Sequence, residues 1–283
     1  MSALQIRSTH QCFGGTQGFY QHDSQTIGLP MRFSVYQPPE VSHRPAPALF
    51  FLAGLTCTEE TFMIKAGAQR LAAEYGLMLV TMDTSPRQTG ITGEDDHWDF
   101  GTGAGFYLDA TQTPWSNYYR MESYVTQELR DIILTQFSAD QDHMGIFGHS
   151  MGGHGALTLS LRHPGMYQSV SAFAPITAPM HCPWGQKAFR FYLGDNQENW
   201  QRHDATALIE AGNHAPEILI DQGLNDPFLT EQLHPDRFET ACRKADQKLT
   251  LRRHASYDHS YYFISTFLAD HLKHHQRLLY RQH

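Results

Sequence analysis

The segment Gly148-His149-Ser150-Met151-Gly152-Gly153 follows the apolar run Met144–Phe147 and precedes a helical pattern over Gly153–Arg162. A Gly-x-Ser-x-Gly motif between a strand and a helix is typical of a nucleophile elbow, in which a tight turn lifts the serine hydroxyl above a sheet. Only small residues fit beside the serine in such a turn, which accounts for the flanking glycines. We therefore predict that Ser150 is a catalytic nucleophile. A glycine-serine turn without chemistry is the alternative.

Strand-like and helix-like segments alternate along the rest of the chain. This alternation indicates a mostly parallel central sheet with helices on both faces, and together with the elbow it predicts an α/β-hydrolase fold. The length of 283 residues fits a single domain, 1–283, and no repeat or linker marks a boundary. The predicted strands are Met31–Tyr36, Ala48–Leu52, Leu77–Met82, Met144–Phe147, Ser169–Phe173, Ile218–Ile220 and Leu249–Leu251. The predicted helices are Glu60–Glu74, Arg120–Phe137, Gly153–Arg162, Asp236–Asp246 and Ser260–Tyr280.

Three parts of the chain depart from this alternation. The first part, through Tyr36, has no helix between its strands and is a candidate for antiparallel pairing. Two longer stretches, Thr84–Trp115 and Pro175–Pro216, are irregular in pattern. Loops of that length in a compact domain are usually functional or locally ordered insertions, so both are candidates for the rim of a site.

A serine hydroxyl is a weak nucleophile, so a carboxylate and a histidine base should follow it in the chain order Ser, Asp/Glu, His. For the acid, the run Ile218–Ile220 leads into a glycine-containing loop, at the strand end where ligand sites of parallel sheets lie. Asp226 lies beyond the turn and can reach upward, so we favour it. Asp221, at the edge of the strand, is the alternative. The aspartate that is not catalytic is expected to be a turn former.

The base must be selected from 18 histidines. It should follow the acid on a loop after the last strand, which favours His259 between Leu249–Leu251 and the final helix. His254 lies closer to that strand and is the alternative. His149 and His154 border the elbow and are expected to pack there.

The closing helix carries His271, His274 and His275, of which the first and last are four residues apart and resemble a metal-ligand pair. No His-Glu-x-x-His motif or nearby carboxylate at ligand spacing accompanies them, so we expect a solvated helix face and no metal. The cysteines are widely spaced without a Cys-x-x-Cys pair, which favours free thiols in a reducing compartment. They are Cys12, Cys57, Cys182 and Cys242.

The oxyanion hole of such an enzyme needs two backbone donors. One should be Met151, the residue after the nucleophile, and the other should come from Ala53-Gly54-Leu55-Thr56-Cys57, which follows an apolar strand. Cys57 is then expected near Ser150 as a residue that contacts substrate, although a buried inert thiol is its default role.

Composition and hydropathy limit the partners. A net charge of -8 disfavours nucleic acid, whose affinity for proteins depends on Lys and Arg. No apolar run approaches the ~18 residues of a membrane-spanning helix, and the first residues lack the apolar segment of a signal peptide. We therefore expect a cytoplasmic protein without a membrane partner.

The chain is similar to the S-formylglutathione hydrolases, also called esterase D, over nearly its whole length. The resemblance implies a triad of Ser150, Asp226 and His259, an oxyanion hole from the Leu55 and Met151 amides, and cofactor-free, metal-independent hydrolysis to formate and glutathione. It also implies a homodimer and a role in cytoplasmic formaldehyde detoxification. The motifs that carry it are Phe13-Gly14-Gly15, Gly54-Leu55-Thr56-Cys57, Asp83-Thr84-Ser85-Pro86-Arg87, Trp98-Asp99-Phe100-Gly101, Gly105-Phe106-Tyr107, Gly148–Gly153, Pro183-Trp184-Gly185, Asp221-Gln222-Gly223 and Tyr257–Phe263.

Two positions depart from the family pattern. Gln88 replaces the glycine after Ser-Pro-Arg, and Ala255-Ser256 stands where Glu-Gly usually precedes Tyr257. Neither touches the predicted triad, but both can alter the rim of the site.

Selectivity for a formyl group requires a closed acyl pocket, and Trp184 and Met151 are our candidates for closing it. Ordinary lid packing is the alternative for Trp184. A broad-specificity short-chain carboxylesterase would use the same machinery. A binding protein that has lost turnover and a metal-dependent hydrolase are more distant alternatives.

Overall fold

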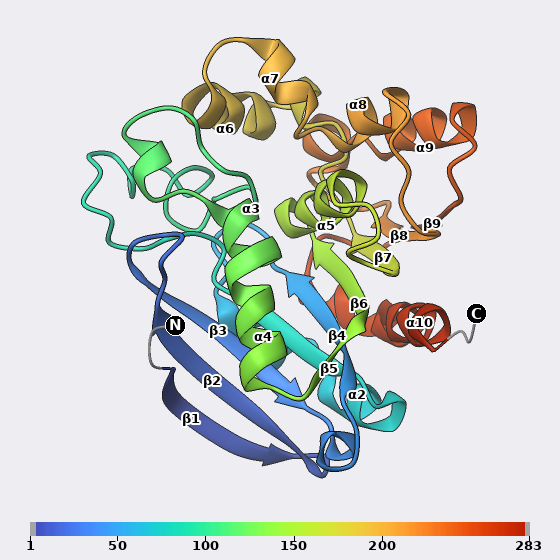
Figure 1. Cartoon of the computed structure of the whole chain (residues 1–283). Helices are drawn as coiled ribbons and strands as arrows, with labels where there is room; N and C mark the ends of the chain where they lie inside the picture. Colours follow the sequence, from blue (N-terminus) through green and yellow to red (C-terminus); the bar gives the residue numbers. More distant parts are fainter. Residues whose placement is uncertain (1–3, 281–283) are drawn as a thin grey trace.

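The computed structural model describes residues 4–280, and its strands form a nine-stranded sheet in the order β1-β2-β3-β5-β4-β6-β7-β8-β9 (Figure 1). The pairs from β5 through β4 to β9 are parallel, whereas β1, β2, β3 and β5 pair antiparallel. The strands are β1 Gln5–Cys12, β2 Gly15–Asp23, β3 Pro30–Gln37, β4 Ala46–Leu52, β5 Met78–Met82, β6 Ala139–His149, β7 Ser169–Phe173, β8 Ile218–Gly223 and β9 Leu249–His254.

Helices cover both faces of the sheet. Helices α4 and α5 pack on one face and α2 and α10 on the other (Figure 1). Helices α6, α7 and α8 lie beyond the carboxyl end of β6, at the top of the view. The helices are α1 Glu59–Lys65, α2 Gln69–Tyr75, α3 Met121–Ser123, α4 Arg130–Gln136, α5 Met151–Arg162, α6 Pro183–Leu193, α7 Gln197–Gln201, α8 Ala205–Glu210, α9 Pro235–Lys244 and α10 Tyr261–Leu279. No helix within residues 4–280 is long and apolar enough to cross a membrane.

All seven predicted strands are present, and the antiparallel pairing of the first part is confirmed. Strands β1 and β2 were not predicted. Most residues of β1 are exposed, so the strand lacks the apolar alternation that marks a half-buried strand. Its neighbour β2 is mostly buried but contains two glycines and two glutamines, which dilute the apolar signal.

Helices lie where they were predicted, but two of the predicted helices are divided into shorter ones. The predicted helix Glu60–Glu74 is two helices, because Gly67 takes a left-handed conformation (φ +70°) that ends α1. A π-helical stretch, Tyr124–Leu129, joins α3 to α4 within the predicted Arg120–Phe137. The irregular stretch Pro175–Pro216 holds α6, α7 and α8, which have short or interrupted apolar patterns.

The core beneath the parallel half of the sheet is aromatic. Every residue of β4 is buried, and the Phe51 ring stacks on Phe62 of α1 at 3.7 Å between centroids. Phe147 of β6 packs edge-on against both rings. Burying each such side chain contributes roughly 1.5–3 kcal/mol. These contacts fix the carboxyl ends of β4 and β6, where the candidate site is built.

Candidate active site

The elbow is the turn between β6 and α5. Ser150 has φ +59° and ψ -119°, a strained conformation for a residue with a side chain. Its N–H donates to the Phe173 carbonyl at 3.0 Å, which ties the turn to β7. A Cβ at Gly148 would collide with the Gly152 backbone, and one at Gly152 would collide with the Leu52 backbone. The flanking glycines are therefore required by close packing, as the sequence motif indicates.

Asp226 and His259 lie together at the same edge of the sheet. His259 Nδ1 is 2.5 Å from Asp226 Oδ2. The Asp226 side chain has no exposed surface, and that of His259 is 14% exposed. The carboxylate also accepts hydrogen bonds from the Phe228 N–H at 2.8 Å and from Gln222 Nε2 at 3.3 Å. This set of contacts holds the carboxylate in place and leaves His259 Nε2 available for chemistry.

Two loops are joined to make this pair. The Asn225 N–H donates to the Tyr257 carbonyl at 2.8 Å, and the Leu224 N–H donates to the His254 carbonyl at 2.9 Å. A Cβ at Gly223 would collide with the backbone of Tyr257 and of the residue after it, at 2.4 and 2.7 Å from their carbonyl oxygens. The loop after β8 can therefore lie directly against the loop after β9.

The Ser150 hydroxyl makes no hydrogen bond with His259 within residues 4–280. His149, the residue before Ser150, packs against His259, with 4.4 Å between the ring centroids. Hydrogen bonds of catalytic groups are often long without substrate, so this geometry is compatible with proton transfer. The structure thus joins Asp226 to His259 directly and places Ser150 one residue from a ring that packs on His259.

His149 is a neighbour of the site whose contact with His259 the sequence did not reveal. Burial lowers the pKa of its ring well below the ordinary value, so the ring is neutral beside His259. A neutral ring does not repel the positive charge that a base gains when it takes a proton. The expectation that His149 and His154 pack beside the elbow is confirmed, since both are buried.

Asp221 has a different set of partners. It accepts hydrogen bonds from Arg252 at 2.6 and 2.5 Å, from His254 at 3.1 Å and from His271 at 3.2 Å. Burial alone would raise the pKa of Asp221, but these donors hold it well below its usual range. The expected turn-forming role is wrong, because the side chain is buried within β8 at the centre of an ionic cluster. His254, the alternative base, belongs to the same cluster.

The loop after β4 lies against the elbow. A Cβ at Gly54 would be 3.2 Å from Ser150 Cβ and 3.3 Å from His149 Nδ1, so the loop backbone closely approaches the nucleophile. The N–H groups of Leu55 and Met151 make no hydrogen bond within the described part of the chain. Two free donors on either side of Ser150 are what an oxyanion hole requires.

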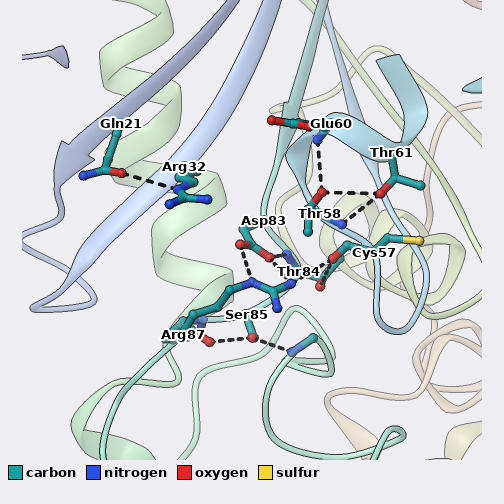
Figure 2. Close-up of polar contacts among 12 residues, drawn as sticks. Gln21, Arg32, Cys57, Thr58, Glu60, Thr61, Asp83, Thr84, Ser85 and Arg87 are labelled. Atoms are coloured by element: carbon teal, nitrogen blue, oxygen red, sulfur yellow. Dashed lines mark hydrogen bonds and ion pairs between the residues drawn. The ribbon is translucent and has the colours of Figure 1, made fainter. Parts of the chain in front are cut away.

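Cys57 is anchored through its backbone (Figure 2). Its carbonyl accepts hydrogen bonds from Thr84 Oγ1 at 2.6 Å and Arg87 Nη2 at 3.3 Å. The thiol points away from the Arg87–Asp83 pair. Burial raises the pKa of the thiol. All four cysteines are free, as predicted.

Trp184 opens α6 and is 6% exposed. Its ring packs on that of Phe228, with 4.7 Å between the centroids. The Phe228 ring in turn packs edge-on against His259, with 5.0 Å between the centroids. Trp98, which is largely exposed, packs edge-on against Trp184, with 5.4 Å between the ring centroids. Sequence reasoning missed Phe228, although its position two residues after Asp226 could have indicated it.

The histidines of α10 are buried, so the predicted solvated face is wrong. His271 Nδ1 and His275 Nε2 both lie 2.8 Å from Ser171 Oγ, and His275 Nδ1 lies 2.7 Å from Ser169 Oγ. His274 contacts the Val170 carbonyl. These partners come from β7, beneath the helix. Within residues 4–280, no group of three or more His, Cys, Asp or Glu side chains could hold a metal ion.

Both departures from the family pattern fall at left-handed positions. Gln88 has φ +57° and Ser256 has φ +68°. This conformation favours glycine, which is the residue that the family pattern has at both places.

Comparisons with known proteins agree on one family. Residues 24–274 match the esterase family model described as "Putative esterase". The S-formylglutathione hydrolase of Mus musculus is 52% identical over 279 residues, 98% of this chain and 99% of that protein. The enzyme of the same name from Arabidopsis thaliana is 53% identical over 281 residues, with the same coverage. The solved S-formylglutathione hydrolase of Agrobacterium tumefaciens superposes with a TM-score of 0.96 at 50% identity, covering 97% of this chain and 99% of that one. The fold is therefore that of the α/β-hydrolases.

Proposed function

Because the chain belongs to the S-formylglutathione hydrolase family of esterases, we propose that it hydrolyses S-formylglutathione to formate and glutathione through a formyl-serine intermediate. The observation that carries the proposal is the Asp226–His259 hydrogen bond, at the same sheet edge as the strained Ser150 elbow. It occurs in a chain about half identical to enzymes of that name. The reaction uses only side chains and backbone amides, so the proposal needs no cofactor and no metal.

In the first half-reaction, Ser150 Oγ attacks the formyl carbon and His259 takes the hydroxyl proton. Asp226 stabilises the resulting imidazolium through Nδ1. The N–H groups of Leu55 and Met151 donate hydrogen bonds to the oxyanion. The C–S bond then breaks, and glutathione leaves as its thiol after receiving the proton from His259.

In the second half-reaction, water attacks the formyl-serine. His259 takes a proton from the water, the oxyanion forms in the same hole, and the ester bond breaks. The proton returns to Ser150 Oγ, and formic acid leaves and releases its own proton to solvent as formate. Each proton accepted by the base is therefore returned within the same half-reaction.

The acyl specificity is assigned to the aromatic wall formed by Trp184 and Phe228. A thiolate is a good leaving group, so the demanding task is to place a very small acyl group. One added methylene in an apolar pocket changes the transition-state energy by only ~1–3 kcal/mol, so steric exclusion must add to contact differences. The packing of Trp184 on Phe228, and of Phe228 on His259, supports a wall close to the reacting carbon.

The test is the dependence of kcat/KM on acyl length with formyl, acetyl and butyryl thioesters of glutathione. We expect a steep fall along the series, and Trp184→Ala should flatten it. Trp200→Ala is the matched control. Trp200 is also buried in the stretch Pro175–Pro216, but its ring contacts Phe189 rather than Phe228. A flat or rising series in the unmodified enzyme would favour the broad-specificity carboxylesterase. Wild-type turnover after Ser150→Ala would remove the serine mechanism altogether.

The proposal extends to the organisation and setting of the enzyme. Residues 1–283 act as a single domain, which the continuous sheet over the described residues supports. The family resemblance supports a cytoplasmic homodimer in formaldehyde detoxification. A small thioester, rather than nucleic acid or a membrane, is the partner. Light scattering after size exclusion tests the dimer.

A further inference from the structure

A cavity of about 530 Å³ lies between β3 and the loop that follows β5. Its lining does not include the proposed catalytic triad. The polar residues that line it include Gln21, Arg32, Asp83, Arg87, Asp95 and Thr102. The volume falls in the range of small-molecule sites, roughly 300–1,000 Å³. The function proposed above gives this cavity no role.

Two of the charged groups in the cavity neutralise each other. Arg87 donates to both carboxylate oxygens of Asp83, at 2.6 and 2.8 Å (Figure 2). The same arginine also donates to the Cys57 carbonyl. This pair is complete as a structural unit, so it provides a neutral floor rather than a binding group.

The other two charges are not neutralised. Arg32, on β3, donates to Gln21 Oε1 at 3.3 Å and has no carboxylate within 4 Å in the described part of the chain. Figure 2 shows its guanidinium beside Gln21, separate from the Asp83–Arg87 pair. Asp95, an exposed residue of the loop after β5, also lines the cavity, and no ion pair or side-chain hydrogen bond joins it to another of residues 4–280. The cavity therefore presents one free cation and one free anion.

A hydroxyl adds a further polar group to the lining. Thr102 lines the same cavity, and its Oγ1 is shielded from solvent beside the Tyr119 hydroxyl.

We propose that this cavity binds an α-amino acid headgroup, with the carboxylate on Arg32 and the ammonium group on Asp95. A guanidinium presents parallel N–H groups that match a carboxylate, and a carboxylate is the complementary acceptor for an ammonium group. A ligand that carries both charges on one carbon can pair with Arg32 and with Asp95, whereas a simple anion leaves Asp95 unpaired. The chemistry thus selects a zwitterion.

Two sources supply this headgroup. One is a free amino acid such as glutamate. The other is the γ-glutamyl end of glutathione, whose γ-linkage leaves its α-amino and α-carboxyl groups free. Only the second source rests on the proposed function.

The experiment is isothermal titration of the full-length Ser150→Ala variant with glutamate, S-methylglutathione and glutarate. Turnover is absent in this variant, so the result does not depend on the esterase activity. At least one of the two zwitterionic ligands should bind, and the tighter one identifies the source. Glutarate, which lacks the ammonium group, should bind at least about tenfold more weakly.

Two further substitutions, Arg32→Gln and Asp95→Asn, should each weaken zwitterion binding about tenfold or more. Arg70→Gln is the matched control, because Arg70 is an exposed arginine paired with Glu74 on α2 and should leave binding unchanged. Far-UV circular dichroism confirms that each variant is folded. Three results overturn the proposal: no binding of either zwitterion at millimolar concentration, binding insensitive to both substitutions, or equal binding of glutarate.

Discussion

Replacing Asp221 with asparagine should destabilise the fold and leave the chemistry intact. The side chain has no exposed surface, and it accepts hydrogen bonds from Arg252, His254 and His271. Asparagine has the same shape but carries no charge, and its amide would face donors where a carboxylate oxygen now accepts. The substitution therefore leaves Arg252 without its buried counter-ion.

The expected loss of stability depends on how far the partners of Asp221 are exposed. Breaking a buried ion pair by removing one member is unfavourable by roughly 3–5 kcal/mol. The Arg252 side chain is 32% exposed and keeps a second partner, Asp270, at 2.7 Å. These features place the loss near the lower end, about 3 kcal/mol. For a chain of this length, that free energy corresponds to a fall in Tm of about 5 °C.

The assay is thermal or urea unfolding of Asp221→Asn beside Asp270→Asn. Asp270 binds the same arginine, but its side chain is 53% exposed, so its loss should change stability by less than ~1 kcal/mol. The pKa of Asp221 is depressed in the folded state. Its contribution is therefore present above the unfolded-state pKa near 4 and is lost as the pH falls through the folded-state value. The difference between the two variants should accordingly be largest near neutral pH and shrink in acid.

Two results would refute this reasoning. Equal stability of the two variants at neutral pH would mean that the buried ionic cluster contributes no more than a surface pair. Loss of kcat in Asp221→Asn with an unchanged Tm would mean that Asp221, rather than Asp226, is the catalytic acid.

Three further predictions concern the site and its rim. Each of Ser150→Ala, Asp226→Asn and His259→Ala should lower kcat by roughly 10³–10⁶-fold without unfolding, with non-additive effects in steady-state assays of double variants; additive losses would contradict a unit of three. A bulky thiol reagent should inhibit the enzyme by modifying Cys57, whereas Cys57→Ser should stay active and resistant. Inhibition should become faster as the pH rises, because the thiolate is the reactive form and burial raises the pKa of the thiol. Full activity after complete alkylation of Cys57 would show that it lies outside the site. Ser256→Gly should stabilise the protein by about 0.5–1 kcal/mol in urea unfolding because it relieves a positive φ, whereas Ser256→Ala should not; equal effects of the two would contradict the role of backbone strain.

The elbow and the parallel strands could be predicted because local sequence determines them. The run before Ser150 is apolar, and the glycines around it are the only residues that fit, so sequence and backbone geometry carry the same information. Strand β1 could not be predicted in this way. Its residues face solvent on most positions, and it is a strand because β2 supplies its hydrogen bonds.

The histidines of α10 show why the remaining features escaped prediction. A polar residue at every fourth position predicts a solvent-facing stripe, and His271 and His275 have that spacing. They are buried because Ser171 lies beneath both of them, about 100 positions earlier in the chain. The pairing of Asp226 with His259, 33 positions later, could be anticipated because the order of catalytic groups in this fold is itself a rule. Contacts between distant elements that follow no such rule require the three-dimensional structure, and in this protein they include both the buried Asp221 cluster and the packing of the His149 ring on His259.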